Sequence, residues 1–146
     1  MAAWRSLSGA DRRSLAALAC ALPIVELSLR LLGARRTAAW LTRLLRPGGF
    51  HAPTAIELQQ AERLARLAAI AGPRVPVAAH CLSQSLLVQA LLRRRGLEAE
   101  VQVGVRKNPQ GLDAHAWVQL AGRALAQTSL QHLPLQASSR GPTAPP

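Results

Sequence analysis

The spacing of apolar residues changes once along the chain, at Gly96, and this change limits the folds that the chain can adopt. Before Gly96, apolar residues recur every three or four positions, which predicts amphipathic helices. A glycine or a proline follows each apolar segment closely, as is typical of helix ends. The expected helices cover residues 8–32, 36–45, 54–71 and 81–95.

After Gly96, apolar and polar residues alternate, which predicts half-buried strands. The expected strands cover residues 97–105, 113–120 and 123–129, joined by short turns. Helices followed by an antiparallel meander make an α+β fold. We expect one domain over residues 1–132, with a helical part (1–72) and a part that holds the last helix and the three strands (73–132). Residues 133–146, which are rich in proline and serine, are expected to be a disordered tail.

The composition narrows the classes of partner and of site. The formal net charge of +11 favours acidic partners. Only 3% of the residues are aromatic, and tyrosine is absent, so there is little for bases to stack on and nucleic acid is not an expected partner. The two cysteines and four histidines show no metal-ligand spacing, so we expect neither a metal nor another cofactor. Such sparse cysteines favour a reducing, cytoplasmic setting.

An apolar run over residues 14–32 raises the question of a membrane span. Pro23, Glu26 and Arg30 interrupt the run, whereas a spanning helix needs about 20 nearly uncharged residues. We therefore expect a helix packed within the protein and no membrane association.

Cys81 lies where a proline-containing loop gives way to the fourth expected helix. The free amides of the first helical turn and the positive end of the helix dipole favour a thiolate there, the form that attacks a carbonyl carbon. His115 is the preferred partner, because it lies within a strand that this helix has to pack on. His80 is a weaker candidate, because adjacent side chains at a helix start diverge. Taken alone, Cys81 has the alternative interpretation of a buried structural cysteine.

The segments "CLSQSLLVQALLRRRG", "VGVRK" and "AHAWV" follow one another between Cys81 and Val118. In this order they resemble the stand-alone protease protein of lasso-peptide biosynthesis, a transglutaminase-like cysteine protease that removes the leader from a precursor peptide. The resemblance implies a transglutaminase/papain-like core, with Cys81 as nucleophile and His115 as base and acid. It also implies three partners: the lasso precursor peptide, a leader-recognition protein of the RRE type, and an ATP-dependent macrolactam synthetase.

The chain departs from this family at the third catalytic residue, an aspartate on the next strand. Asp113 is the last carboxylate in the sequence. Gln127 is our candidate for orienting His115, and Asp113 or Thr128 is the alternative. Trp117 shares a strand face with His115 and is expected to form a wall of the substrate cleft. The missing acid leaves open a precursor-binding adaptor without catalysis on the same fold. A thioester-forming acyl transferase or amidase on the same scaffold is a second alternative.

Overall fold

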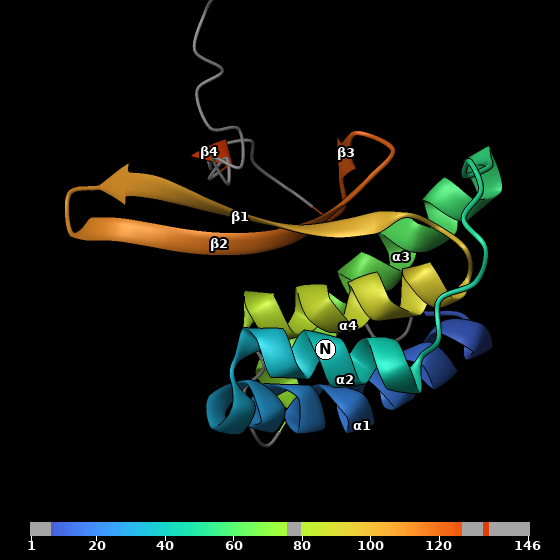
Figure 1. The fold of residues 1–146 in the computed structure, drawn as a ribbon, viewed down its shortest axis with the longest axis horizontal. Coiled ribbons are helices and arrows are strands. Elements are labelled where there is room, and N and C mark those ends of the chain that lie inside the picture. Colours follow the sequence, from blue (N-terminus) through green and yellow to red (C-terminus); the bar gives the residue numbers. More distant parts are fainter. Residues whose placement is uncertain (1–6, 76–79, 127–132, 135–146) are drawn as a thin grey trace, which may run out of the picture.

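The computed structural model describes residues 7–75, 80–126 and 133–134. Within these residues, four α-helices lie on one side of a small antiparallel sheet (Figure 1). This arrangement confirms the predicted α+β fold class, with the helices first and the sheet last in the chain.

The helices begin and end close to the predicted residues. Two of them start with a capping box, in which a side chain before the helix and a carboxylate three residues later each bond the other's backbone: Ser8 with Asp11, and Thr54 with Glu57. The elements are α1 (Gly9–Leu32), α2 (Ala34–Leu44), α3 (Ala55–Ala71), the short 3₁₀ helix η2 (Gly72–Arg74) and α4 (Cys81–Arg94).

The sheet has the strand order β3-β2-β1-β4. Its two long strands, β1 (Ala99–Asn108) and β2 (Gly111–Leu120), confirm two of the three predicted strands. The third, β3 (Arg123–Ala124), has two residues. Leu125 and Ala126 form a turn where the strand was predicted to continue, and residues 127–129 lie outside the described residues. Within the predicted tail, β4 (Leu133–Pro134) pairs with β1, so these two residues extend the sheet. Residues 135–146 also lie outside the described part.

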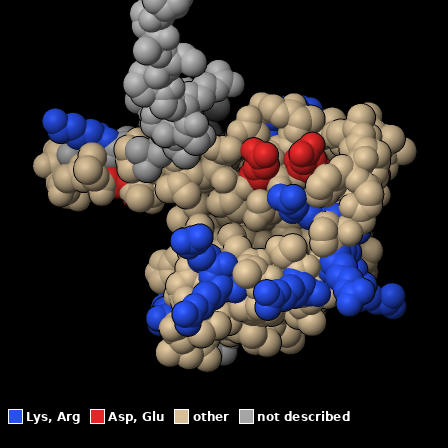
Figure 2. Space-filling model, viewed as in Figure 1, with Lys and Arg blue, Asp and Glu red and all other residues tan. Residues whose placement is uncertain are grey.

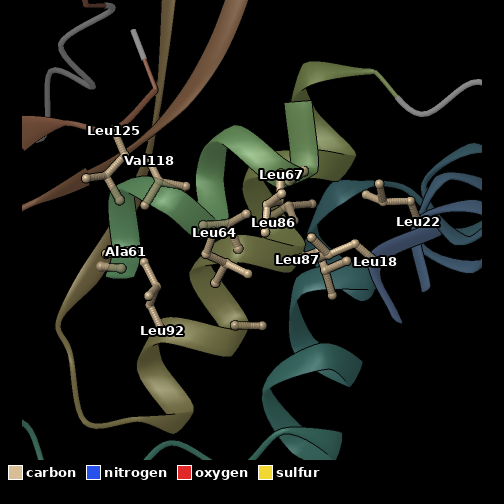
Figure 3. Packing of buried hydrophobic residues seen from close by; sticks show 14 of the residues in the cluster. Leu18, Leu22, Ala61, Leu64, Leu67, Leu86, Leu87, Leu92, Val118 and Leu125 are labelled. Atoms are coloured by element: carbon tan, nitrogen blue, oxygen red, sulfur yellow. The ribbon is translucent and has the colours of Figure 1, made fainter. Parts of the chain in front are cut away.

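One hydrophobic core joins the two layers, with α4 at its centre (Figure 3). α4 packs against α1, α2 and α3 on one side and against β1 and β2 on the other. In the sheet, Ala99 pairs with Leu120 and Val101 with Val118, so these four apolar side chains share one face. The core contains Leu18, Leu22, Ala61, Leu64, Leu67, Leu86, Leu87, Leu92, Val118 and Leu125.

α1 is long and apolar enough to cross a membrane when judged by length and composition alone. Its inner face, with Leu15, Leu18 and Leu22, is buried in the core, and its two carboxylates, Asp11 and Glu26, bond to residues of other elements. The helix therefore packs within the protein along one face, as the sequence predicts. Of its apolar window, 28% is buried, and the rest is half-buried or exposed.

Candidate active site

Cys81 is the first residue of α4 and carries a free, half-buried thiol. Its backbone N–H belongs to the first helical turn, where amides have no partner within the helix and point outward. This placement confirms the predicted helix start. The catalytic role of Cys81 remains a prediction.

His115 and Trp117 lie two residues apart on β2, so their side chains extend from the same face of the strand. Their rings are stacked, with centroids 6.2 Å apart and planes inclined by 22°. The neighbouring Val118 points the other way, into the core with the helices. His115 and Trp117 therefore extend from the sheet face that is turned away from the helices.

A small cavity of about 60 Å³ is lined by residues of both layers. α4 contributes Cys81 and Ser85, α3 contributes three alanines, and β2 contributes the consecutive residues 115–118. A strand face presents alternate residues, whereas a strand edge presents consecutive ones. The cavity therefore lies at the edge of β2, beside the stretch at which β3 pairs with Gln119 and Leu120.

Cys81 and His115 both line this cavity. They reach it from different layers, because the helix packs on one face of the sheet and the imidazole extends from the other. For the two groups to react, the imidazole has to approach the sulphur around the edge of β2. Trp117 lines the same cavity and is buried, in a position suited to its predicted role as a wall.

Of the three candidates for the third catalytic residue, Asp113 lies within the described residues. Gln127 and Thr128 lie outside the described residues. Asp113 is half-buried on β2, two residues before His115 and on the same strand face. Its Cα partner on β1 is Arg106.

A buried carboxylate that the sequence analysis did not include lies beside Cys81. Glu26 of α1 accepts hydrogen bonds from Ser83 Oγ at 2.7 Å, from the His80 backbone N–H at 3.2 Å and from Arg30 Nε at 3.0 Å. One of its oxygens also lies 3.1 Å from His80 Nδ1. His80 therefore turns its ring towards Glu26.

The hydrogen bonds around Glu26 keep it ionised. Burial by itself would raise the pKa of its carboxyl group. The hydrogen bonds from Ser83, from the backbone and side chain of His80, and from Arg30 outweigh burial and lower the pKa to about 2. The carboxylate is thus negatively charged at every physiological pH.

The sequence did contain a signal for Glu26. Leu15, Leu18 and Leu22 form the buried stripe of α1, and helical spacing places position 26 on the same stripe. A carboxylate on a buried stripe requires partners. As an interruption of an apolar run, Glu26 argues only against a membrane span, and its contact with the turn that carries Cys81 goes unpredicted.

A thiol at a helix start and an imidazole at the same cavity can carry out acyl chemistry through a thioester. The sulphur attacks a carbonyl carbon, and the imidazole transfers protons to and from the leaving and attacking groups. This chemistry is compatible with hydrolysis and with transfer to an amine.

The sequence profile of the transglutaminase-like superfamily matches residues 24–136, a range that contains both Glu26 and the cavity. The superfamily commonly includes cysteine peptidases and acyltransferases, and the match concerns the superfamily rather than lasso-peptide proteases in particular. Searches of curated proteins and of solved structures found no match. Because the profile covers well over half of the chain, the protein belongs to the transglutaminase-like superfamily.

Proposed function

We propose that this protein is a leader peptidase of lasso-peptide maturation, which cuts the precursor peptide between leader and core by Cys-His catalysis. The observation that carries the proposal is the meeting of Cys81 and His115 at one cavity. Superfamily membership supports the thiol chemistry, and the motifs between Cys81 and Val118 support the choice of substrate. Two free cysteines suit a cytoplasmic reaction.

In the proposed reaction, the Cys81 thiolate attacks the carbonyl carbon of the bond between leader and core. The Cys81 backbone N–H, in the first turn of α4, is placed to stabilise the oxyanion. The His115 imidazolium gives its proton to the departing amine of the core, and a thioester with the leader remains. His115 then takes a proton from water as its oxygen attacks the thioester, the leader leaves as a carboxylic acid, and the Cys81 thiolate and the imidazolium are restored.

A leader-recognition protein that presents the precursor would need a docking surface, and α1 and α2 offer one. Residues 9–46 contain seven arginines, all exposed, and two carboxylates, both buried in ion pairs. Figure 2 shows arginine side chains spread over the helical side, since the chain's one lysine, Lys107, lies in β1. An apolar groove of about 420 Å³ runs between α1, α2 and α4, with Leu18, Leu41 and Leu87 among its lining residues. Such a surface suits a partner segment that is apolar on one side and acidic around it. The freed core would pass to a macrolactam synthetase.

The test is a cleavage assay with a lasso precursor peptide and its leader-recognition protein, followed by mass spectrometry. The wild-type protein should release leader and core, and Cys81→Ala should cut at least about 10³-fold more slowly, because the nucleophile is lost. His115→Ala should lose activity to a similar degree. Cys20→Ala is the matched control, because Cys20 is the other free cysteine and is exposed on α1. It should cut at the wild-type rate.

The same assay separates the other two functions. A wild-type protein that binds the precursor and leaves it intact would be an adaptor, and equal cleavage by Cys81→Ala would exclude Cys81 as nucleophile. Added hydroxylamine traps the thioester as a hydroxamate. If an added amine captured most of the acyl group in competition with water, the protein would be an acyl transferase.

A further inference from the structure

We infer that Glu26 is a positioning residue, which holds the first turn of α4 so that Cys81 is aligned for attack. The inference rests on the proposed function in taking Cys81 as the nucleophile. It adds a residue that lies in another helix, 55 positions earlier in the chain.

The Glu26 carboxylate bonds residues on both sides of Cys81 in the sequence. Its oxygen Oε2 accepts from the His80 backbone N–H, immediately before Cys81, and from Ser83 Oγ, two residues after it. Ser83 Oγ also lies 2.8 Å from the His80 carbonyl oxygen. The backbone that carries the sulphur is therefore clamped between two anchored neighbours.

Glu26 does for α4 what a local capping box does for the other two capped helices. In α1 and α3, a carboxylate at the third helical position bonds the backbone N–H of the capping residue. In α4 the third position is Ser83, and the carboxylate comes from α1 instead. The start of the nucleophile's helix is thereby fixed to a second helix, which packs against α4 along the core.

The charge of the carboxylate strengthens this clamp. It lies at the start of α4, where the helix dipole is positive and favours an anion. Arg30 bonds the same carboxylate and balances its charge. Hydrogen bonds to a charged acceptor are stronger than those to a neutral one, so the charge holds the turn more firmly than a neutral side chain would.

The clamp predicts that Glu26→Gln separates peptide cleavage from the reaction with a small reagent. Glutamine keeps the size of the side chain but has no charge and one accepting oxygen in place of two. That oxygen can replace Oε2 only as a neutral, weaker acceptor for His80 and Ser83, and the NH₂ group cannot accept from Arg30. Alignment for peptide cleavage is then weakened, whereas a small alkylating reagent does not require it. A role limited to stability would not produce this divergence.

Asp11 provides a matched control on the same helix. Its side chain is 6% exposed and that of Glu26 is 7% exposed, and each is paired with an arginine. Asp11 ties the first turn of α1 to Arg63 of α3 and touches neither His80 nor Ser83. Asp11→Asn should therefore reduce stability without affecting Cys81.

The experiment compares Glu26→Gln and Asp11→Asn in a Cys20→Ala background, so that Cys81 is the one thiol. For each variant, kcat and KM for the precursor peptide, the alkylation rate of Cys81 by iodoacetamide at pH 7 and the melting temperature are measured. We expect Glu26→Gln to lower kcat by at least tenfold with KM within twofold, and to keep its alkylation rate within twofold. Asp11→Asn should keep both rates within twofold and lose melting temperature.

Two results would overturn the inference: a wild-type kcat in Glu26→Gln, or equal losses of kcat in both variants in step with melting temperature. If the parent protein does not cleave the precursor, the proposed function fails, and amide hydrogen exchange still tests the placement of Glu26. Exchange in the first turn of α4 that is no faster in Glu26→Gln than in the parent and in Asp11→Asn would then contradict the clamp.

Discussion

At the scale of single residues, the distinctive feature is the buried, negatively charged carboxylate of Glu26, which is surrounded by hydrogen-bond donors. Glu26 is stabilised as an anion in the folded protein by Ser83, His80 and Arg30. In the unfolded chain the same carboxyl group has an ordinary pKa near 4.5. The lower folded value, about 2, means that folding favours the ionised form. Glu26 thus links stability to pH.

The sign of this link gives a prediction for acid. The stabilisation is complete above the unfolded pKa and is lost as pH falls through the folded pKa. The shift from 4.5 to about 2 corresponds to about 3 kcal/mol. In urea titrations followed by circular dichroism, Glu26→Gln should therefore unfold more easily than wild type at pH 6. At pH 3 the difference in unfolding free energy should be about half as large. An equal difference at both pH values would contradict it.

At the scale of elements, the end of α4 shows how a local signal is completed by distant contacts. The C-terminal turn closes with hydrogen bonds from Leu97 N–H to the Leu92 carbonyl and from Gly96 N–H to the Arg93 carbonyl. Gly96 has a φ of +83°, which favours glycine. Its carbonyl accepts from the His51 N–H at 2.9 Å, so this turn also anchors the loop between α2 and α3.

Gly96→Ala should be strongly destabilising, for two reasons. A side chain at positive φ costs about 1–2 kcal/mol, and the added Cβ would lie 2.5 Å from the Gly49 carbonyl oxygen, which is backbone and has to shift. We expect a loss of at least about 2 kcal/mol, or a fall in melting temperature on the order of 5–10 °C.

Gly9→Ala is the control for this prediction. Gly9 is the first residue of α1, and nothing lies within 4 Å of the position that its Cβ would take. Its melting temperature, measured by calorimetry, should match or slightly exceed that of wild type, because alanine favours a helix. Equal melting temperatures for the two variants would show that Gly96 is not under the expected constraint.

Local periodicity was sufficient to predict most elements but not their partners. The helical stripe and the following glycine identified α4, and alternation identified β1 and β2, because these signals lie within one segment. The contacts of Glu26 with Ser83 and of Gly96 with Gly49 join segments far apart in the sequence. A local pattern can indicate that Glu26 needs a partner, but it does not indicate which segment supplies one. The two-residue strand β4 lacks any periodicity, since two residues are too few to alternate.

The sequence was sufficient to predict which two residues form the candidate site, but not how their side chains are arranged. The motifs identified Cys81 and His115, and the structure places both at one cavity. Alternation along β2 also shows that His115 and Val118 point to opposite faces, a consequence that the sequence analysis did not draw. Because Val118 lies in the core, His115 extends from the other face, and the imidazole has to pass the edge of β2 to reach the sulphur.

At the scale of the whole molecule, the charge is unevenly distributed. Arginines cover α1 and α2, while both carboxylates of those helices are buried (Figure 2). The same helices border the apolar groove and expose large apolar side chains, including Leu44. An exposed apolar surface bordered by charges of one sign is typical of an interaction site.

This surface gives a prediction for the proposed partner. Leu44→Glu should weaken binding of the leader-recognition protein at least tenfold in isothermal titration calorimetry, because it places a charge in the groove. Arg35→Glu with Arg36→Glu should weaken it as well, and more at low salt than at high salt.

Leu112→Glu is the control, because Leu112 lies on β2 and is 74% exposed, compared with 69% for Leu44. It should bind as wild type does. Unchanged binding in Leu44→Glu would show that the groove is not part of the docking surface. If the protein bound vesicles of anionic lipid and all three variants weakened that binding equally, the surface would act by general charge attraction and not through a groove.

The division of the cavity between two layers has a consequence for synthesis of the chain. Cys81 starts α4, and His115 is supplied by β2, which the ribosome produces later. If the two residues act together as proposed, a nascent chain that has emerged only as far as α4 has the nucleophile without its base. Cleavage would then begin only after the hairpin of β1 and β2 has folded back onto the helices.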